Sequence, residues 1–180
     1  MSLEQYKGIF IFAQQVDGEL SGIALELLGK AKELAEQLEE KTVTAVLLGS
    51  GISGLKETLA HYGADRVIVV DDPELKDYRT EPYTHALACV IQKYQPEILL
   101  IGATAIGRDL GPRVAARVHT GLTADCTALE IGKHEDKKAG KTYENLLYQI
   151  RPAFGGNIVA TIINPEHRPQ MATVREGVMK

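Results

Sequence analysis

Residues 98–129 read ILLIGATAIGRDLGPRVAARVHTGLTADCTAL, and this stretch decides the fold. Its first four residues form an apolar run typical of a buried strand, and a turn of small residues follows at 102–108. A helical pattern comes next, and we expect Pro112 in its first turn because a later proline would lose a backbone hydrogen bond. The helix should therefore start no earlier than about Gly107. α/β proteins use this strand–turn–helix arrangement to point backbone N–H groups at a phosphate or a similar partner, so the turn marks the expected functional edge.

Three arginines accompany this turn and helix. Arg108 lies in the turn, and Arg113 and Arg117 are spaced so that they share one face of the helix. They could bind an anion at the turn or form ion pairs across a protein–protein interface. An ordinary solvated helix face is the third interpretation, and the sequence leaves all three open.

The chain before this stretch alternates between strands and helices. Strands are expected at 8–13, 42–48, 66–70 and 98–101, and helices at about 20–40, 52–62, 80–94 and 107–118. The strands are continuously apolar, which indicates that both of their faces are buried. This pattern predicts an α/β fold with a doubly wound, mostly parallel sheet.

The pattern changes from Thr123 onward. Strands without intervening helices are expected at 123–131, 143–152, 157–163 and 170–174. The charged and polar stretch 132–141 is typical of an exposed hairpin loop. We therefore expect an antiparallel, β-rich C-terminal extension beside the parallel sheet, and we interpret residues 1–180 as a single domain.

Composition excludes several classes of protein. A net charge of −4 and a pI near 5.8 argue against a nucleic-acid partner. No apolar run approaches the roughly 20 residues that span a bilayer, and the N-terminus does not resemble a signal peptide. The two cysteines, Cys89 and Cys126, are interpreted as buried free thiols in a reducing compartment, which predicts a cytoplasmic protein.

Two polar stretches are weak candidates for binding sites. Residues 49–54, GSGISG, could hold a phosphate, but a tight strand–helix turn is the favoured interpretation. The acidic residues within 71–77 lack the glycine and glutamate of a calcium loop, so a solvated loop is favoured over a metal site. The histidines show no pair at ligand spacing on one helix, and no metal site is expected.

Residues 151–157, RPAFGGN, form the second informative stretch. Arg151 ends a predicted strand, and a proline and a glycine pair follow it. Such a turn lets the backbone approach a flat ligand closely while the guanidinium group reaches the polar edge of that ligand. A plain hairpin turn is the alternative, and the residues alone do not decide between the two.

Together these segments resemble the N-terminal domain of the alpha subunit of electron transfer flavoproteins. The resemblance is carried, in collinear order, by residues 96–102, 103–113, 120–126, 151–157 and 168–175. It implies a Rossmann-like fold related to the adenine-nucleotide α-hydrolases, FAD as the electron carrier, and a heterodimer with a beta subunit of similar fold. It also implies exchange of electrons with an acyl-CoA dehydrogenase-type or other redox partner.

The RPAFGGN form favours the electron-bifurcating branch of that family. In this branch a second flavin lies in the beta subunit, and an arginine in a matching turn of the alpha subunit faces the isoalloxazine ring. The resemblance therefore implies that Arg151, Phe154 and Gly155 contact a cofactor. A positive group at this ring would stabilise a reduced, anionic flavin and shift its potential. No catalytic residue is assigned to the chain itself, because the flavin does the chemistry.

Alpha subunits of the family continue into a second domain that supplies most of the FAD site. That domain is expected to be absent from this chain, so FAD binding is expected in the assembled heterodimer.

Two other functions stay open at this point. The chain could be a stand-alone AMP- or ATP-binding module that holds the nucleotide at 102–107, or a scaffold whose Arg113 and Arg117 face a partner. A self-sufficient nucleotide site should offer a Gly/Ser-rich loop after the first or fourth strand. The loop after the fourth strand holds the bulky Ile106 and Arg108 instead, which argues against the nucleotide module.

Overall fold

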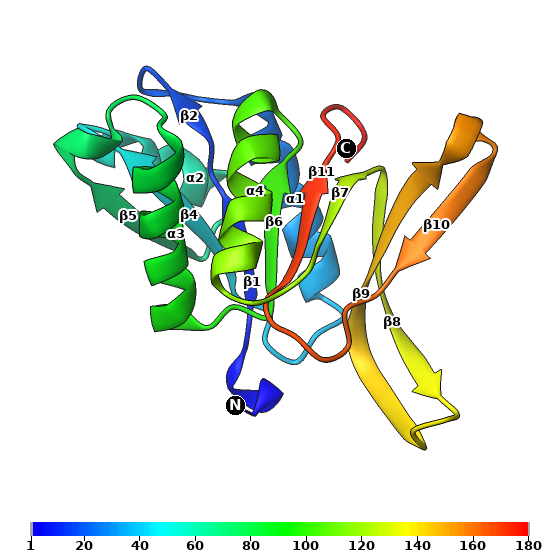
Figure 1. Ribbon diagram of the computed structural model, residues 1–180. Helices are drawn as coiled ribbons and strands as arrows, with labels where there is room; N and C mark the ends of the chain where they lie inside the picture. The colour runs from blue at the N-terminus through cyan, green and yellow to red at the C-terminus, as the bar shows by residue number, and fades with distance from the viewer. Residues whose placement is uncertain (1, 180) are drawn as a thin grey trace.

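The computed structural model describes residues 2–179 and contains a six-stranded parallel sheet (Figure 1). The strand order is β5-β4-β1-β6-β11-β7, and every neighbouring pair is parallel. The bounds of these strands are β1 Ile9–Phe12, β4 Val43–Gly49, β5 Arg66–Asp71, β6 Ile98–Gly102, β7 Leu122–Cys126 and β11 Gln170–Val174. The predicted doubly wound α/β fold is confirmed.

Helices cover both faces of this sheet. The α-helices are α1 Gly22–Ala35, α2 Lys56–His61, α3 Thr80–Tyr94 and α4 Ala105–Arg117. The side chains of β1 alternate between the two faces, so that Ile9 and Ile11 pack with α1 while Phe10 and Phe12 pack with α3 and α4. Figure 1 shows α3 and α4 together on one side of the sheet. The two faces thus bury two separate apolar clusters.

The remaining elements are short pieces and one projecting sheet. Four 3₁₀ turns lie at η1 Leu3–Gln5, η2 Ser53–Leu55, η3 Pro73–Leu75 and η4 Phe154–Gly156, and a small hairpin joins β2 Gln15–Val16 to β3 Glu19–Leu20. An antiparallel sheet, in the order β10-β9-β8, comprises β8 Ala128–Asp136, β9 Lys141–Ala153 and β10 Ile158–Ile162. We call residues 128–162 the arm. It projects beyond β7, and its two hairpin ends point in opposite directions (Figure 1).

The C-terminal strands differ from the prediction in two ways. The expected strand at 123–131 is two strands, because the chain bends at Thr127 and passes from β7 of the parallel sheet to β8 of the arm. The last strand, β11, does not join the antiparallel extension but inserts between β6 and β7. All five of its residues are buried, so the chain places this short apolar segment where both faces are covered.

Helix α4 begins earlier than predicted. It starts at Ala105, and Pro112 lies in its interior rather than in its first turn. Thr104 is the N-cap, and its hydroxyl accepts a hydrogen bond from the N–H of Gly107 at 3.0 Å. Pro112 is exposed, so the one backbone carbonyl that it leaves without a helical donor can be hydrated.

Other expectations also need correction. Helix α1 ends at Ala35 rather than near residue 40, and the strands of the arm shorten the expected loop 132–141 to residues 137–140. Cys126 is buried as expected, whereas Cys89 is exposed. Across residues 2–179, the helices are too short or too polar to span a bilayer.

Candidate functional site

The carboxyl ends of β6, β7 and β11 lie at one edge of the sheet, beside the arm (Figure 1). Asp125 stands at the end of β7 in the left-handed backbone region, with φ of 59°. Its carboxylate accepts a hydrogen bond from the Arg175 guanidinium at 2.6 Å, just beyond β11. The backbone N–H of Arg175 donates to the carbonyl of Cys126 at 2.9 Å. Side-chain and backbone bonds thus fasten the two strand ends together.

Two further arginines act on the same carboxylate. The pKa of Asp125 is lowered mainly by the hydrogen bond from Arg175, and the positive charges of Arg108 and Arg151 add to this effect. Arg108 is oriented by its own turn, because its Nε donates to the carbonyl of Ala103 at 2.9 Å. Arg175 therefore binds this carboxylate directly, while two arginines from distant segments act on it electrostatically. We call these four charged residues the arginine cluster.

Arg151 leaves its whole guanidinium group unpaired within residues 2–179, whereas Arg108 uses its Nε and Arg175 is bonded to Asp125. Arg151 lies on β9 opposite Ala160, and it is partly buried. Within residues 2–179 its guanidinium has no hydrogen-bond or ion-pair partner. With Pro152, Ala153 and Phe154, it lines a hollow of about 450 Å³. Its donors are therefore available to a group that this chain does not provide.

The turn after Arg151 is open to its surroundings. Phe154 is 91% exposed, which is unusual for a large apolar side chain. Gly155 and Gly156 have φ of 70° and 78°, a conformation that favours glycine. Apart from the adjacent residues of the chain, no atom lies within 4 Å of where a Cβ would stand on either residue. The structure thus presents an aromatic ring and bare backbone side by side on an uncovered turn.

The strand that follows continues this apolar surface. Ile158, Val159 and Ile162 on β10 are 59%, 62% and 38% exposed. Ile158 and Ile162 lie on one face of the strand and Val159 on the other, so this hairpin of the arm, with Phe154 at its turn, leaves apolar side chains uncovered on both faces. Uncovered apolar surface of this kind marks interaction sites. We call Phe154, Ile158, Val159 and Ile162 the arm patch.

The turn at 102–108, by contrast, is closed by its own chain. The Thr104 hydroxyl accepts from Gly107 and donates to Oε1 of Gln14 at 2.6 Å. A Cβ on Gly107 would stand 1.8 Å from the carbonyl oxygen of Gly102, so the helix start packs directly onto the strand end. The turn therefore contributes Arg108 to the cluster, while its capping N–H is already used.

The other two arginines of α4 pair with neighbouring carboxylates. Nε of Arg113 lies 3.4 Å from Asp109, and Arg117 lies 3.1 Å from Glu81 of α3. Thr80 is the first residue of α3, and its hydroxyl donates to Asp109 of α4 at 2.6 Å. The Arg117–Glu81 and Thr80–Asp109 contacts fasten α3 to α4, while the Arg113–Asp109 pair lies within α4. Both arginines thus pair with carboxylates of this chain on an exposed helix face.

The two polar stretches considered as weak binding sites, residues 49–54 and 71–77, form hydrogen bonds within the chain. The N–H of Gly51 donates to Asp71 at 2.8 Å, and Asp72 accepts from the N–H of Glu74 at 2.9 Å. Both aspartates thus have turn-forming roles. Within residues 2–179, no group of three or more His, Cys, Asp or Glu side chains is placed to hold a metal ion.

Sequence reasoning did not select Asp125 or Arg175. These residues are fifty positions apart, and they meet only because β11 lies beside β7. The sequence signal that could have pointed to them is that each is a charged residue at the end of an apolar segment.

Comparison with known proteins gives a consistent result. Residues 9–180 match the family described as electron transfer flavoprotein domain. The chain is 49% identical over 178 residues to the electron transfer flavoprotein subunit alpha of Thermoanaerobacterium thermosaccharolyticum, which covers 99% of this chain and 51% of that protein. It is 44% identical over 191 residues to the acryloyl-CoA reductase electron transfer subunit beta of Anaerotignum propionicum, covering 99% of this chain and 52% of that protein.

A third relative is the subunit LctC of the NAD⁺- and ferredoxin-dependent lactate dehydrogenase of Acetobacterium woodii. The identity is 46% over 173 residues, covering 96% of this chain and 39% of that protein. The chain therefore spans about half the length, or less, of these curated relatives.

Proposed function

Because the chain belongs to the electron transfer flavoprotein family, we propose that it acts as the N-terminal domain of an alpha subunit, which carries electrons between redox enzymes through FAD. Relatives named as alpha subunits support this role, since they match nearly the whole chain at 49% identity. The likeness to LctC, whose name includes NAD⁺ and ferredoxin, supports the electron-bifurcating branch. We assign residues 1–180 to one domain, and the free cysteines are compatible with a cytoplasmic location.

The arm patch supports a partner subunit. Its four side chains are exposed together on one hairpin, and an uncovered apolar surface of this kind favours association with another protein. We propose that a beta subunit covers it. The redox partner is then an acyl-CoA dehydrogenase-type or similar enzyme that the assembled protein meets.

Arg151, Phe154 and Gly155 fit one wall of a flavin site. The fit rests on Arg151, whose guanidinium lies beside an open turn with no partner among residues 2–179. Phe154 can pack against a flat ring, and the exposed backbone at Gly155 permits close approach. When bound, the flavin supplies the electron-transfer chemistry.

The chain's own residues then have distinct tasks. Arg151 donates hydrogen bonds to the ligand and contributes positive charge. The bond between Arg175 and Asp125 fixes the strand ends behind it, and the arm patch excludes water once a partner covers it. A stand-alone AMP or ATP module has less support, because the N–H of Gly107 at the start of α4 already donates to the Thr104 hydroxyl of the same chain.

A binding experiment tests the proposal. FAD and AMP are titrated into the 180-residue chain alone and into the chain mixed with an electron transfer flavoprotein beta subunit, with calorimetry and flavin fluorescence as readouts. We expect tight FAD binding in the mixture and weak or no binding by the chain alone.

Ile158→Lys tests whether the arm patch is the interface. It should weaken assembly with the beta subunit by at least about tenfold, the effect of losing one strong interface contact. Tyr62→Lys, at a similarly exposed aromatic residue outside the arm, is the matched control and should leave assembly unchanged. Micromolar AMP binding by the chain alone, with no effect of the beta subunit, would contradict the proposal.

A further inference from the structure

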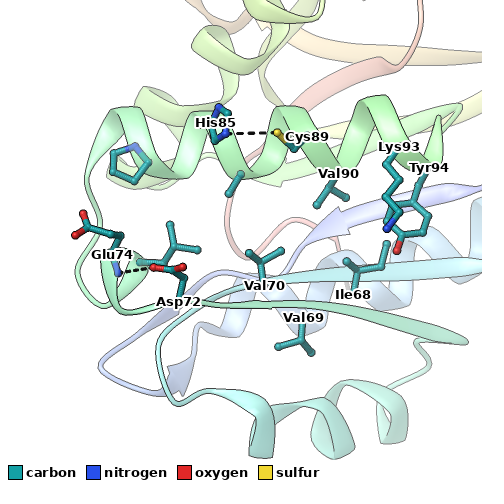
Figure 2. A pocket seen from close by; sticks show the side chains of 13 residues that line it. Ile68, Val69, Val70, Asp72, Glu74, His85, Cys89, Val90, Lys93 and Tyr94 are labelled. Atoms are coloured by element: carbon teal, nitrogen blue, oxygen red, sulfur yellow. Dashed lines mark hydrogen bonds between the residues drawn. The ribbon is translucent and has the colours of Figure 1, made fainter.

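The strand β5 forms the edge of the sheet opposite to the arm. Helix α3 lies on one side of the sheet but covers the β5 side chains on that side only in part. Alternation along the strand directs Arg66, Ile68 and Val70 to the face on which α3 lies, while Val67 and Val69 face α2. Helix α3 packs over the neighbouring strands, so that Ile68 and Val70 stay only partly buried. The result is a groove between α3 and β5 (Figure 2).

This groove is large enough for a small molecule and is mainly apolar. Its volume is about 520 Å³, within the range of ligand sites. The apolar side chains on the α3 side of β5 that line it are Ile68, Val70, Leu75, Pro82, Ala86 and Val90. His85 and Cys89 stand on the helix side of the groove (Figure 2), with Sγ of Cys89 3.7 Å from Nε2 of His85.

The two ends of the groove differ in charge (Figure 2). Asp72 and Glu74 lie at one end, and Lys93 and Tyr94 lie at the other. An anion is therefore disfavoured at the first end and favoured at the second.

The basic end continues into a polar hollow of about 230 Å³. Tyr94 lines both spaces, and its ring centre is 5.3 Å from the Arg66 guanidinium carbon and 5.3 Å from Nζ of Lys93. Lys7 also lines the hollow, as does Glu40. Three cations and one carboxylate thus line the two spaces that share Tyr94.

These three cations have unused capacity. None of them is within ion-pairing distance of a carboxylate in the part of the chain that the structure describes. Arg66 uses only its Nε, which donates to Thr44 at 3.2 Å. The Glu40 carboxylate, in turn, accepts from both the N–H and the hydroxyl of Thr42. A carboxylate ligand would therefore find free donors here.

We propose that this groove binds a small anionic amphiphile, such as a medium-chain fatty acid. The unbranched chain lies on Ile68 and Val70, and the carboxylate lies at the Tyr94 end among Lys7, Arg66 and Lys93. This site is at the sheet edge remote from the arginine cluster, so it does not depend on the flavin proposal.

Cys89 provides the test, because it stands beside the groove and is exposed, whereas Cys126 is buried. The rate at which neutral iodoacetamide alkylates Cys89 is measured by mass spectrometry on the 180-residue chain, with octanoate, hexanoate or octanol added. Octanoate should slow the reaction at least about fivefold at saturation. Removing each methylene should raise the half-protecting concentration about threefold, as expected for a mostly buried chain. Octanol, which lacks the charge, should need at least about a fivefold higher concentration.

The combined Lys7→Ala and Lys93→Ala variant isolates the head-group contacts. It should raise the half-protecting concentration of octanoate about tenfold and leave that of octanol unchanged. Lys133→Ala, an exposed lysine on the arm, is the matched control and should change neither. Urea midpoints of all variants verify that they fold.

Several results would overturn the proposal. They are an absence of protection, equal protection by octanol and octanoate, or a lysine variant that behaves like the original chain. A Cys89 rate that falls with protein concentration in the absence of ligand would instead assign the groove to a second copy of the chain.

Discussion

At the scale of single residues, charged side chains connect the carboxyl ends of β7 and β11. Asp125 accepts from Arg175, and the electrostatic influence of Arg108 and Arg151 reaches the same carboxylate. Three arginines from separate segments thus act on one carboxylate, one of them by a direct hydrogen bond. An arginine is suited to this role because it stays protonated and its planar group donates in fixed directions.

Arg151→Ala should lower the midpoint potential of a flavin bound in the assembled protein. Loss of one positive charge removes about 1.4 kcal/mol of favourable interaction with a reduced ring, which corresponds to about 30 mV for two electrons. Spectroelectrochemical titration of the complex measures this shift. Arg151→Lys keeps the charge and should retain most of the potential, so a change of equal size in both variants would point to altered packing instead.

The bond between Asp125 and Arg175 predicts a pH-dependent stability. The pKa of Asp125 is lowered in the folded chain, chiefly by the hydrogen bond from Arg175. Its contribution is therefore present above the unfolded-state value near pH 4 and is lost as the pH falls through the lower, folded-state value. Asp125→Asn should reduce the free energy of unfolding by about 0.5–1 kcal/mol at pH 7, since both groups keep contact with solvent.

That difference should approach zero in the strongly acidic range, as measured by urea denaturation at both pH values. Asparagine tolerates the left-handed backbone of this position, so the substitution removes the charge and one of the two acceptors that Arg175 uses without straining the backbone. Asp17→Asn provides the control, because Asp17 also has a positive φ of 52° but lies outside the cluster. A deficit of constant size down to the acidic range would disprove the linkage.

At the scale of elements, local sequence patterns predicted the individual helices and strands well, but they did not predict which strands pair with each other. Helix α3 spans 80–94 as predicted, because the apolar spacing of that segment is enough to define it. The place of β11 could not be predicted, since Met171 and Val174 would be equally apolar in either sheet. The strands that β11 pairs with depend on how the chain returns to the parallel sheet after the whole arm.

The candidate site likewise has residues that the sequence singled out and contacts that only the fold creates. Arg108 and Arg151 were visible in the sequence because each is next to a glycine-containing turn. Their proximity to Asp125, and the part played by Arg175, follow only from the order of β6, β11 and β7. Tertiary pairing, rather than local propensity, thus assembles the site.

Gly107→Ala tests the contact between α4 and β6. A Cβ at this position would overlap the Gly102 carbonyl oxygen at 1.8 Å, so the helix would have to move. We expect a loss of at least about 3 kcal/mol in the free energy of unfolding, measured by urea denaturation with circular dichroism. Gly29→Ala is the matched control on α1, where no atom lies within 4 Å, and it should stabilise by up to about 1 kcal/mol. Similar effects of both substitutions would show that the contact is unimportant.

At the scale of the whole molecule, two opposite edges of one sheet have different surfaces. The edge at β7 carries the arm and the arginine cluster, while the edge at β5 carries the amphiphile groove (Figure 1). The rigid parallel sheet between them holds the two sites apart. Each site can therefore be altered without contact with the other, which makes their experiments independent.

The two thiols report on the integrity of this whole arrangement. Cys126 is fully buried where β7, β11 and the arm meet, and burial raises the pKa of its thiol to about 11. Cys89 is exposed. At pH 8 a disulfide reagent should therefore react with one thiol quickly and with the second at least about a thousandfold more slowly, as expected for a reaction that waits for unfolding. Cys89→Ser should abolish the fast reaction and leave the slow one.

The dependence of the slow reaction on urea shows which opening exposes Cys126. If β7, β11 and the arm separate only when the chain unfolds, the logarithm of the rate should rise with urea at the slope of global unfolding. A slow reaction that is insensitive to urea would mean that the arm detaches by itself. The arm would then be a separately opening unit, and Cys126 would report on its docking rather than on the complete fold.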